Sequence, residues 1–159
     1  MNDEPVVYAG KVLEKWIDYN EHMNDACYVS VFSESIDNLM DYIGIDEKFR
    51  AFEGVSIYTL QTSVHYLKEL GLGGSLAVSA RLLEYDSKKL RVFLTMGDPS
   101  FAEHFATMEA LLLHVDMTVR RSSPFRTKTL EKIGALFAAQ REKPWPARAG
   151  EGISLQKGR

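Results

Sequence analysis

The segment from Trp16 to Asn24 gathers most of the side chains in this sequence that could carry out chemistry. Trp16-Ile17-Asp18-Tyr19-Asn20-Glu21-His22-Met23-Asn24 combines carboxylates, amides, an imidazole and aromatic rings. A carboxylate such as Asp18 can activate water as a general base or attack a carbonyl carbon directly. If a helix begins after Asn24, its first free N–H groups can stabilise a developing oxyanion beside that carboxylate. The segment therefore predicts a site that cleaves an acyl bond.

A purely structural interpretation stays open at this point. Asp18 and Asn20 are also common turn residues, because their side chains bond to nearby backbone groups. The four histidines, His22, His65, His104 and His114, do not show the spacing of paired metal ligands. We therefore predict no metal site.

The elements around this segment can be read from hydrophobic periodicity. A β-rich run from Val6 to Val12 comes first, and Lys15 to Asn24 reads as a loop. Asn24 or Asp25 is a suitable N-cap for a long helix that stops at Gly44. The apolar stripe expected on that helix consists of Val29, Phe32, Ile36, Leu39, Met40 and Ile43, widened by Cys27 and Val31.

Alternating patterns predict four further strands. They run over 58–66, 76–82, 90–96 and 107–119, with a hairpin turn at Asp86-Ser87. Ser123-Pro124 is expected to open a short final helix, because proline is tolerated at the first helical position. The predicted fold is α+β: a five-stranded antiparallel sheet wrapped around one long central helix. Such a sheet leaves an edge, which pairing across a two-fold axis can protect.

Composition sets limits on the kind of protein. The chain has 159 residues, a net charge of -3 and one cysteine, Cys27. We expect one domain over 1–140 and a flexible tail over 141–159, where proline and glycine become frequent. The slight acidic excess argues against a nucleic-acid surface. A single cysteine allows no intrachain disulfide, and no apolar run is long enough to cross a bilayer, so we expect a cytoplasmic protein with no membrane partner.

The same segment resembles the start of hot-dog fold thioesterases of the 4-hydroxybenzoyl-CoA type. The matching positions are Asp18, His22, Met23, Asn24 and Tyr28. The resemblance continues to about residue 125 and is nearest to the betainyl-CoA thioesterase group of carnitine catabolism, through Tyr58-Thr59-Leu60-Gln61, His65-Tyr66-Leu67, Asp86-Ser87-Lys88-Lys89-Leu90, His114-Val115-Asp116-Met117 and Pro124-Phe125.

The resemblance implies an acyl-CoA thioesterase, most simply one that cleaves betainyl-CoA to betaine and CoA. Coenzyme A would be part of the substrate, and no separate cofactor is expected. Asp18 would be the general base or nucleophile, and N–H groups near Asn24 and Asp25 would hold the oxyanion. The resemblance also implies a homodimer or dimer of dimers, with sites at the subunit interface. CoA phosphates would lie near basic residues such as Lys68, Arg81, Lys88, Lys89, Arg120 or Arg121.

Aromatic faces suit a quaternary ammonium head through cation–π contact. The expected substrate-binding residues are Trp16, Tyr19, Asn20, His22, Tyr58, Gln61 and Tyr66. Two of the family's positions differ here. Glu21 stands where the family usually has glycine, which leaves the loop's conformation open. Gln61 stands where many relatives have glutamate, which weakens the case for a cationic acyl group. A thioesterase for a neutral short or medium acyl-CoA and a non-catalytic acyl-binding protein remain alternatives.

Overall fold

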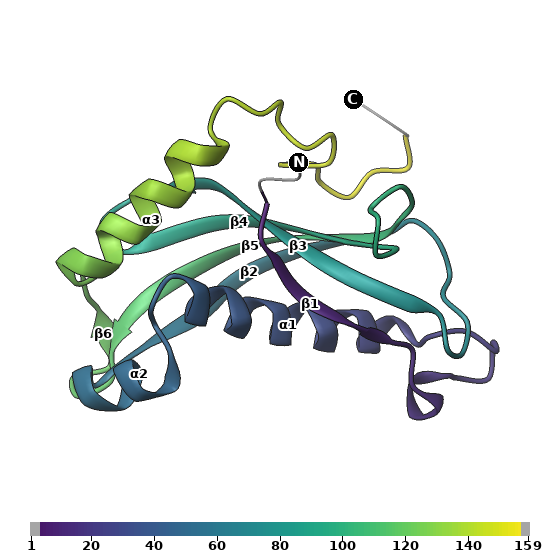
Figure 1. The fold of residues 1–159 in the computed structure, drawn as a ribbon, viewed down its shortest axis with the longest axis horizontal. Helices are drawn as coiled ribbons and strands as arrows, with labels where there is room; N and C mark the ends of the chain where they lie inside the picture. The colour runs from purple at the N-terminus through teal and green to yellow at the C-terminus, as the bar shows by residue number, and fades with distance from the viewer. Residues whose placement is uncertain (1–3, 157–159) are drawn as a thin grey trace.

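The computed structural model describes residues 4–156 and forms one curved sheet around a long helix (Figure 1). The elements in chain order are β1 (Val6–Lys11), a short 3-10 turn (Glu14–Trp16), α1 (Asp25–Tyr42), α2 (Glu47–Glu53), β2 (Val55–Tyr66), β3 (Ser75–Tyr85), β4 (Lys89–Gly97), β5 (His104–Asp116), β6 (Arg121–Ser122) and α3 (Thr127–Gln140). None of the described helices is long and apolar enough to cross a membrane.

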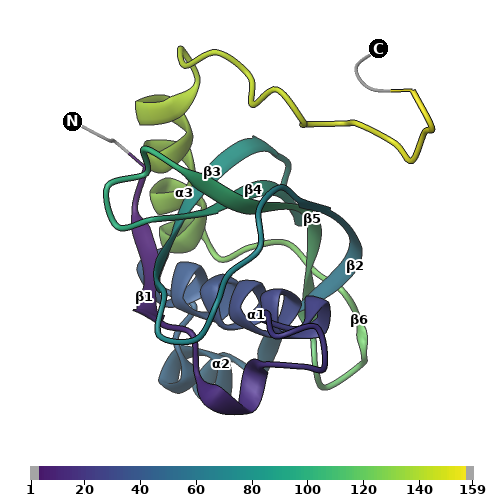
Figure 2. The ribbon, with the colours of Figure 1, turned by 90° about the vertical axis from the view of Figure 1, so that its right-hand side faces the viewer.

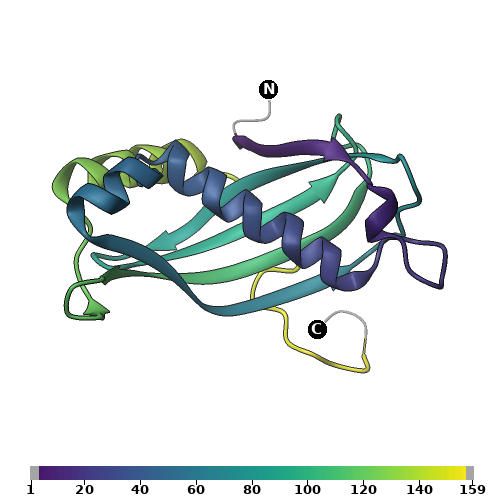
Figure 3. The ribbon, with the colours of Figure 1, turned by 90° about the horizontal axis from the view of Figure 1, so that it is seen from below.

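The sheet is antiparallel, with strands in the order β1-β3-β4-β5-β2 and with β6 added beside β5. Its inner face wraps α1, as the views from the side and from below show (Figures 2 and 3). The predicted fold, an antiparallel sheet around one central helix, is confirmed. β2 ends the order and pairs only with β5, so one long edge of the sheet carries no strand neighbour in the described chain.

Alternation along the strands separates the two faces. On β3 and β4, residues such as Leu82 and Val92 point inward and join the core that packs on α1. Their neighbours Arg81 and Arg91 therefore point to the outer face, away from α1. The buried side of α1 consists of Tyr28, Val31, Phe32, Ser35, Ile36, Leu39 and Met40. Val29 was expected on this side but is exposed, because the true stripe is rotated toward Tyr28 and Val31.

The helix ends follow the predicted capping chemistry. Asn24 is the N-cap of α1, and its side chain accepts a hydrogen bond from the Ala26 amide. Gly44 follows the helix with φ +87°, a left-handed conformation that glycine adopts without strain. The turn between β3 and β4 is closed by the Asp86 N–H, which donates to the Lys89 carbonyl at 3.0 Å.

Two helical predictions were wrong. The short helix α2 was not foreseen, although Asp46 caps it and Gly54 ends it. The last helix begins at Thr127, not at Ser123-Pro124. The Ser123 and Phe125 amides instead donate to His114 and Ser87, which holds this segment beside β5 and delays the helix.

Residues 141–151 lie on the outer face of the sheet (Figure 1). α3 ends at Gln140, and the division of the chain into a domain over 1–140 and a tail over 141–159 stays a prediction. The flexibility expected of 141–159 concerns motion and stays a prediction, and residues 157–159 lie outside the described part of the chain.

Candidate active site

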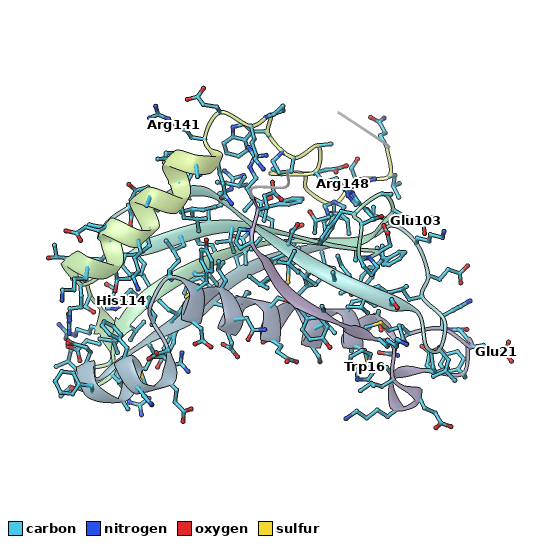
Figure 4. All side chains as sticks on the ribbon, in the orientation of Figure 1. Trp16, Glu21, Glu103, His114, Arg141 and Arg148 are labelled. Atoms are coloured by element: carbon cyan, nitrogen blue, oxygen red, sulfur yellow. The ribbon has the colours of Figure 1, made fainter. Side chains whose placement is uncertain are left out.

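The loop before α1 is a tight and well-bonded turn. Ile17 and Met23 form an isolated antiparallel bridge, and the Asp18 N–H donates to the His22 carbonyl at 3.1 Å. The Glu21 N–H donates a hydrogen bond to the Asp18 carbonyl at 3.0 Å. Glu21 lies at the tip with φ +65°, so this residue adopts the left-handed conformation that glycine would favour (Figure 4). The departure from glycine at this position therefore leaves a glycine-like backbone in place.

Both oxygens of the Asp18 carboxylate are held by hydrogen bonds. Oδ1 accepts from the Asn20 backbone N–H at 2.8 Å, and Oδ2 accepts from the Asn24 side-chain amide at 3.0 Å. The other end of that amide, Asn24 Oδ1, accepts from the Ala26 N–H at 2.9 Å. One asparagine thus caps α1 and fixes the orientation of the partly buried carboxylate.

The helix N-terminus narrows the set of oxyanion donors. The Asn24 N–H donates to the Trp16 carbonyl at 2.8 Å, and the Ala26 N–H is taken by the cap. Asp25 occupies the first helical position, where an N–H has no intrahelical acceptor. Its backbone N–H is therefore the donor that this end of the helix can offer to a ligand.

A cleft of about 650 Å³ lies over this loop. It is lined by Asp18, Tyr19, Asn20, His22, Met23, Asn24, Asp25, Tyr28, Tyr66, Leu67, Lys68 and Glu69. The residues come from the loop, the first turn of α1, the end of β2 and the segment that follows β2. The cleft therefore joins the proposed carboxylate to the C-terminal end of the free sheet edge.

Two tyrosines form one wall of the cleft. The rings of Tyr28 and Tyr66 meet edge to face with centroids 5.4 Å apart. Their hydroxyls donate to the carbonyls of Lys68 and Asp25, at 3.3 Å and 3.2 Å. Burial raises the pKa of both phenols, so both stay neutral donors at physiological pH. Tyr28 is buried, whereas Tyr66 keeps half of its surface exposed.

The charges around the cleft favour a cation. Asp18, Asp25 and Glu69 contribute carboxylates, against the single lysine Lys68. The Lys68 ammonium pairs with Glu103, and the His22 imidazole lies against the Glu69 carboxylate. With Lys68 compensated by Glu103, a net negative charge remains for a ligand to meet.

The structure brings most of the predicted site residues together. Asp18, Tyr19, Asn20, His22, Asn24, Asp25 and Tyr66 all line the cleft. Three others do not. Trp16 packs against the core, while Tyr58 and Gln61 pair with outer-face positions of β5, where the Tyr58 hydroxyl contacts Met117 Sδ. The chemical roles given to all ten residues stay predictions.

Of the six basic residues suggested for the CoA phosphates, only Lys68 lines the cleft. Arg81 is unsuited to that role, because its guanidinium is buried and donates to the Lys143 and Pro144 carbonyls at 2.6 Å and 2.5 Å. Arg120 ends the turn after β5 and Arg121 begins β6, which pairs with the end of β5 that follows His114, at the opposite end of the molecule from Trp16 (Figure 4).

Sequence reasoning missed Glu69 and gave Tyr28 no place in the site. Glu69 lies in the turn-rich segment after β2, and periodicity gives no signal for such a position. Tyr28 had a usable signal, because it lies one helical turn after Asn24 and therefore on the same side of α1.

The comparisons with known proteins agree with this geometry. Residues 12–133 match the family described as the thioesterase-like superfamily. The chain is 36% identical over 155 residues to the betainyl-CoA thioesterase of Pseudomonas aeruginosa, a match that covers 98% of each protein. It is also 38% identical over 138 residues to an L-carnitine dehydrogenase/betainyl-CoA thioesterase of Agrobacterium fabrum, covering 87% of this chain and 28% of that protein.

Solved structures give the same result. A hypothetical protein of Staphylococcus aureus, determined in complex with CoA, superposes with a TM-score of 0.89 at 27% identity, over 96% of this chain and 97% of that one. A putative thioesterase of Pseudomonas putida superposes with a TM-score of 0.83 at 34% identity over the same shares. The chain thus belongs to the thioesterase-like superfamily and has the hot-dog fold.

Proposed function

We propose that this protein hydrolyses a small acyl-CoA and that Asp18 is its catalytic carboxylate. The observation that carries the proposal is the Asp18 side chain, which lines the cleft and is held by Asn20 and Asn24 beside the first N–H of α1. A carboxylate fixed next to a helix N-terminus can activate a nucleophile on one side of a carbonyl carbon and stabilise negative charge on the other.

The reaction then proceeds in two steps. A water molecule attacks the thioester carbonyl carbon while the Asp18 carboxylate accepts its proton, and the Asp25 N–H holds the resulting oxyanion. Collapse of this intermediate breaks the carbon–sulfur bond, and the CoA thiolate takes up the proton. If Asp18 attacks directly, a mixed anhydride forms and water cleaves it. A single turnover in H₂¹⁸O that leaves ¹⁸O in Asp18 would establish direct attack, because general-base catalysis places ¹⁸O only in the released acid.

Replacing Asp18 by asparagine tests the assignment. Asp18→Asn keeps the shape but cannot accept a proton, and kcat/KM should fall at least about 100-fold. The change lies in a partly exposed loop, so the circular dichroism spectrum and the unfolding midpoint should stay close to those of the wild type. Glu14→Gln, a neighbouring exposed acid outside the cleft, is the matched control. Wild-type turnover by Asp18→Asn would remove the proposed role.

For the acyl group we propose betaine, attached to CoA as betainyl-CoA. Two relatives that match most of this chain carry that activity in their names. The cleft adds a physical reason, because an aromatic wall of Tyr28 and Tyr66 and an excess of carboxylates suit a trimethylammonium head. The neutrality of Gln61 does not oppose this proposal, since Gln61 does not line the cleft.

A carbon isostere isolates the contribution of the positive charge. 3,3-Dimethylbutanoyl-CoA has the shape of betainyl-CoA with carbon in place of nitrogen. Tyr66→Leu should reduce the betainyl preference over this isostere by roughly 2- to 30-fold relative to the wild type, the range of one cation–π contact. Tyr66→Phe keeps the ring and should keep the preference. An unchanged preference in Tyr66→Leu, or faster turnover of straight-chain acyl-CoAs, would support a neutral substrate, and no CoA release from any thioester would support acyl binding without catalysis.

We also propose that the active form is a homodimer, or a dimer of dimers, joined through the β2 edge. β2 has twelve residues, ends the sheet and exposes Tyr58, Leu60 and Tyr66. A long edge strand without a neighbour pairs readily with another strand. Because the cleft lies at the C-terminal end of β2, such pairing would place a second chain beside it. Sedimentation of the purified protein at several concentrations tests the assembly.

The mechanism above uses only side chains, backbone N–H groups and water, so we propose that no separate cofactor or metal takes part. Dialysis against EDTA should leave kcat/KM unchanged. We further propose a cytoplasmic location, which the presence of a single, unpaired cysteine supports. Cell fractionation tests that location.

A further inference from the structure

The tail that follows α3 crosses the sheet strand by strand. The Pro144 carbonyl accepts from Arg81 on β3 at 2.5 Å, and the Trp145 ring lies 5.1 Å from the Arg91 guanidinium on β4. The Gly150 N–H donates to Glu109 on β5 at 2.6 Å. These contacts follow the order of the strands in the sheet, so the tail runs across the outer face toward the β2 edge.

The crossing is completed on β2 itself. The Glu151 carboxylate lies 3.5 Å from the His65 imidazole, and Arg148 donates to the same carboxylate at 3.1 Å. His65 is the next to last residue of β2. The tail thus reaches the free edge at the C-terminal end of that strand.

Beyond Glu151 the chain continues past the edge. The yellow end of the ribbon extends outside β2 both from the side and from below (Figures 2 and 3). Ile153 and Leu155 lie in this arm, residues 152–156, and are 108% and 105% exposed. A pair of fully exposed aliphatic side chains beside an unpaired strand edge is a candidate contact for a second copy of the chain.

Two-fold symmetry identifies the surface that each arm would reach. Two β2 strands related by a dyad run antiparallel, so the C-terminal half of one lies beside the N-terminal half of the other. The arm leaves its own sheet at His65 and would enter the other sheet near Tyr58. On the outer face there, Tyr58 pairs with Leu113 of β5. Leu111 lies two residues before Leu113 and therefore on the same face. All three side chains are partly exposed.

A groove is already present at this place. It has a volume of about 500 Å³ and is lined by Gln61, Leu111, Gly152 and the chain's own Ile153, among others, whereas Tyr58 and Leu113 do not line it. Because Leu111 forms part of its floor, an aliphatic side chain entering from a second copy would find an apolar contact there. The partner's arm and the chain's own tail would then lie side by side on the same outer face.

We propose that the C-terminal arm is exchanged between two copies of this chain, Ile153 and Leu155 of each packing on Tyr58, Leu111 and Leu113 of the other. The proposal rests on the homodimer proposed above and adds a second contact to it. The arm ties the two sheets together on the face opposite α1, and so the tail contributes to assembly without contacting the cleft.

Disulfide trapping between two differently tagged chains tests this exchange. In a Cys27→Ser background, one chain carries Ile153→Cys and the other Tyr58→Cys. Mild oxidation of the mixture should give a covalent heterodimer, which a contact within one chain cannot produce. Ile153→Cys mixed with Leu72→Cys, an exposed position in the loop after β2, is the control and should give little product. A yield no higher than in this control would overturn the exchange.

A second measurement separates the exchange from the dimer. Replacing Ile153 and Leu155 together by aspartate should raise the dimer dissociation constant at least about tenfold, because each arm would lose two buried side chains. Leu72→Asp should leave it unchanged. If the dissociation constant of the arm variant is unchanged, the arm exchange is wrong but the proposed dimer is not affected. If the wild-type chain is monomeric at all concentrations, both the dimer and the exchange are wrong.

Discussion

Asn24 bonds to two neighbours, and substitutions can separate its two roles. Asn24→Asp keeps the helix cap, since aspartate caps as well as asparagine, but it removes the donor to Asp18 and adds a second carboxylate. Two adjacent carboxylates raise the pKa of the pair. The acidic limb of the pH dependence of kcat/KM should therefore move to higher pH than in the wild type.

The comparison with alanine completes this prediction. Asn24→Ala loses the cap as well and should be less stable than the wild type by about 1 kcal/mol in urea unfolding. Asn24→Asp should lose little stability. An Asn24→Asp enzyme with the wild-type pH profile would show that the amide does not tune Asp18.

Single residues also show how much of the site could be predicted from the sequence. The closeness of Asp18, Asn24 and Asp25 was predictable, because a capping residue and the loop before it are neighbours in the chain. The left-handed φ of Glu21 could be anticipated from the glycine that the family has there. The place of Glu69 in the site could not be anticipated, because only the tertiary fold brings the segment after β2 against His22.

Gln140 links α3 to β3 and carries a prediction at the scale of elements. Its side chain is fully buried, accepts from the Leu82 N–H at 2.8 Å and donates to the Ala80 carbonyl at 3.3 Å. β1 pairs with β3 only as far as Ser79, so this amide continues the ladder where the strand partner ends.

Gln140→Leu fills the same space without these hydrogen bonds and should destabilise the protein by roughly 1–3 kcal/mol. The free energy of opening at the Leu82 amide, measured by native-state hydrogen exchange, should decrease by the same amount. Glu131→Leu, at an exposed position on the same helix, is the control. Unchanged protection of Leu82 in Gln140→Leu would mean that the amide bonds add nothing to the edge of β3.

His114 holds β5 to the segment before α3. Its Nδ1 lies 2.8 Å from the Ser123 carbonyl, its ring lies against Phe125, and the side chain is 1% exposed. Burial lowers the pKa of this imidazole, and Arg126 adds to the effect, while the Ser123 carbonyl and Asp116 oppose it. The folded protein therefore binds this proton less readily than the unfolded chain does.

The sign of the pH effect follows from this difference. Above the unfolded pKa of about 6.5, His114 is neutral in both states and stability is at its full value. As pH falls from there, the unfolded state gains the proton and stability decreases by up to about 1.4 kcal/mol per pH unit. His114→Phe should flatten the pH dependence of the unfolding free energy between pH 6.5 and 5, whereas the exposed His104→Gln should not. An equally steep dependence in His114→Phe would assign the effect to other groups.

Elements differ in how far they could be predicted. α1 and the long strands follow from periodicity, because each buries one face against the same core. α2 has seven residues, none of them fully buried, and Phe49 alone packs against the core, so no periodic apolar stripe reveals the helix. The start of α3 depends on hydrogen bonds that Ser123 and Phe125 donate to the carbonyls of His114 on β5 and of Ser87 in the β3–β4 turn. A proline that permits a helix start locally cannot reveal such tertiary bonds.

At the scale of the whole molecule, the site and the free edge of the sheet are connected. The cleft includes Tyr66, the last residue of β2, and Leu67, which follows it. The strand edge that would bind a second chain therefore ends in the proposed substrate cleft. The two edges of the sheet are unequal. β1 has six residues, whereas β2 has twelve and exposes Leu60 at its middle, beside a break in the register with β5.

A lysine at Leu60 tests whether assembly and catalysis depend on each other. Charge on an exposed edge strand opposes strand pairing, and Leu60 is already 51% exposed, so the folded chain can tolerate the change. If the dimer forms through β2, Leu60→Lys should shift it toward monomer in sedimentation, while Leu72→Lys should not. If the second chain also completes the cleft, kcat/KM should fall in step with the dimer fraction and recover at high protein concentration. A monomer with full activity would confine the site to one chain, and an unaltered dimer would place the interface elsewhere than on β2.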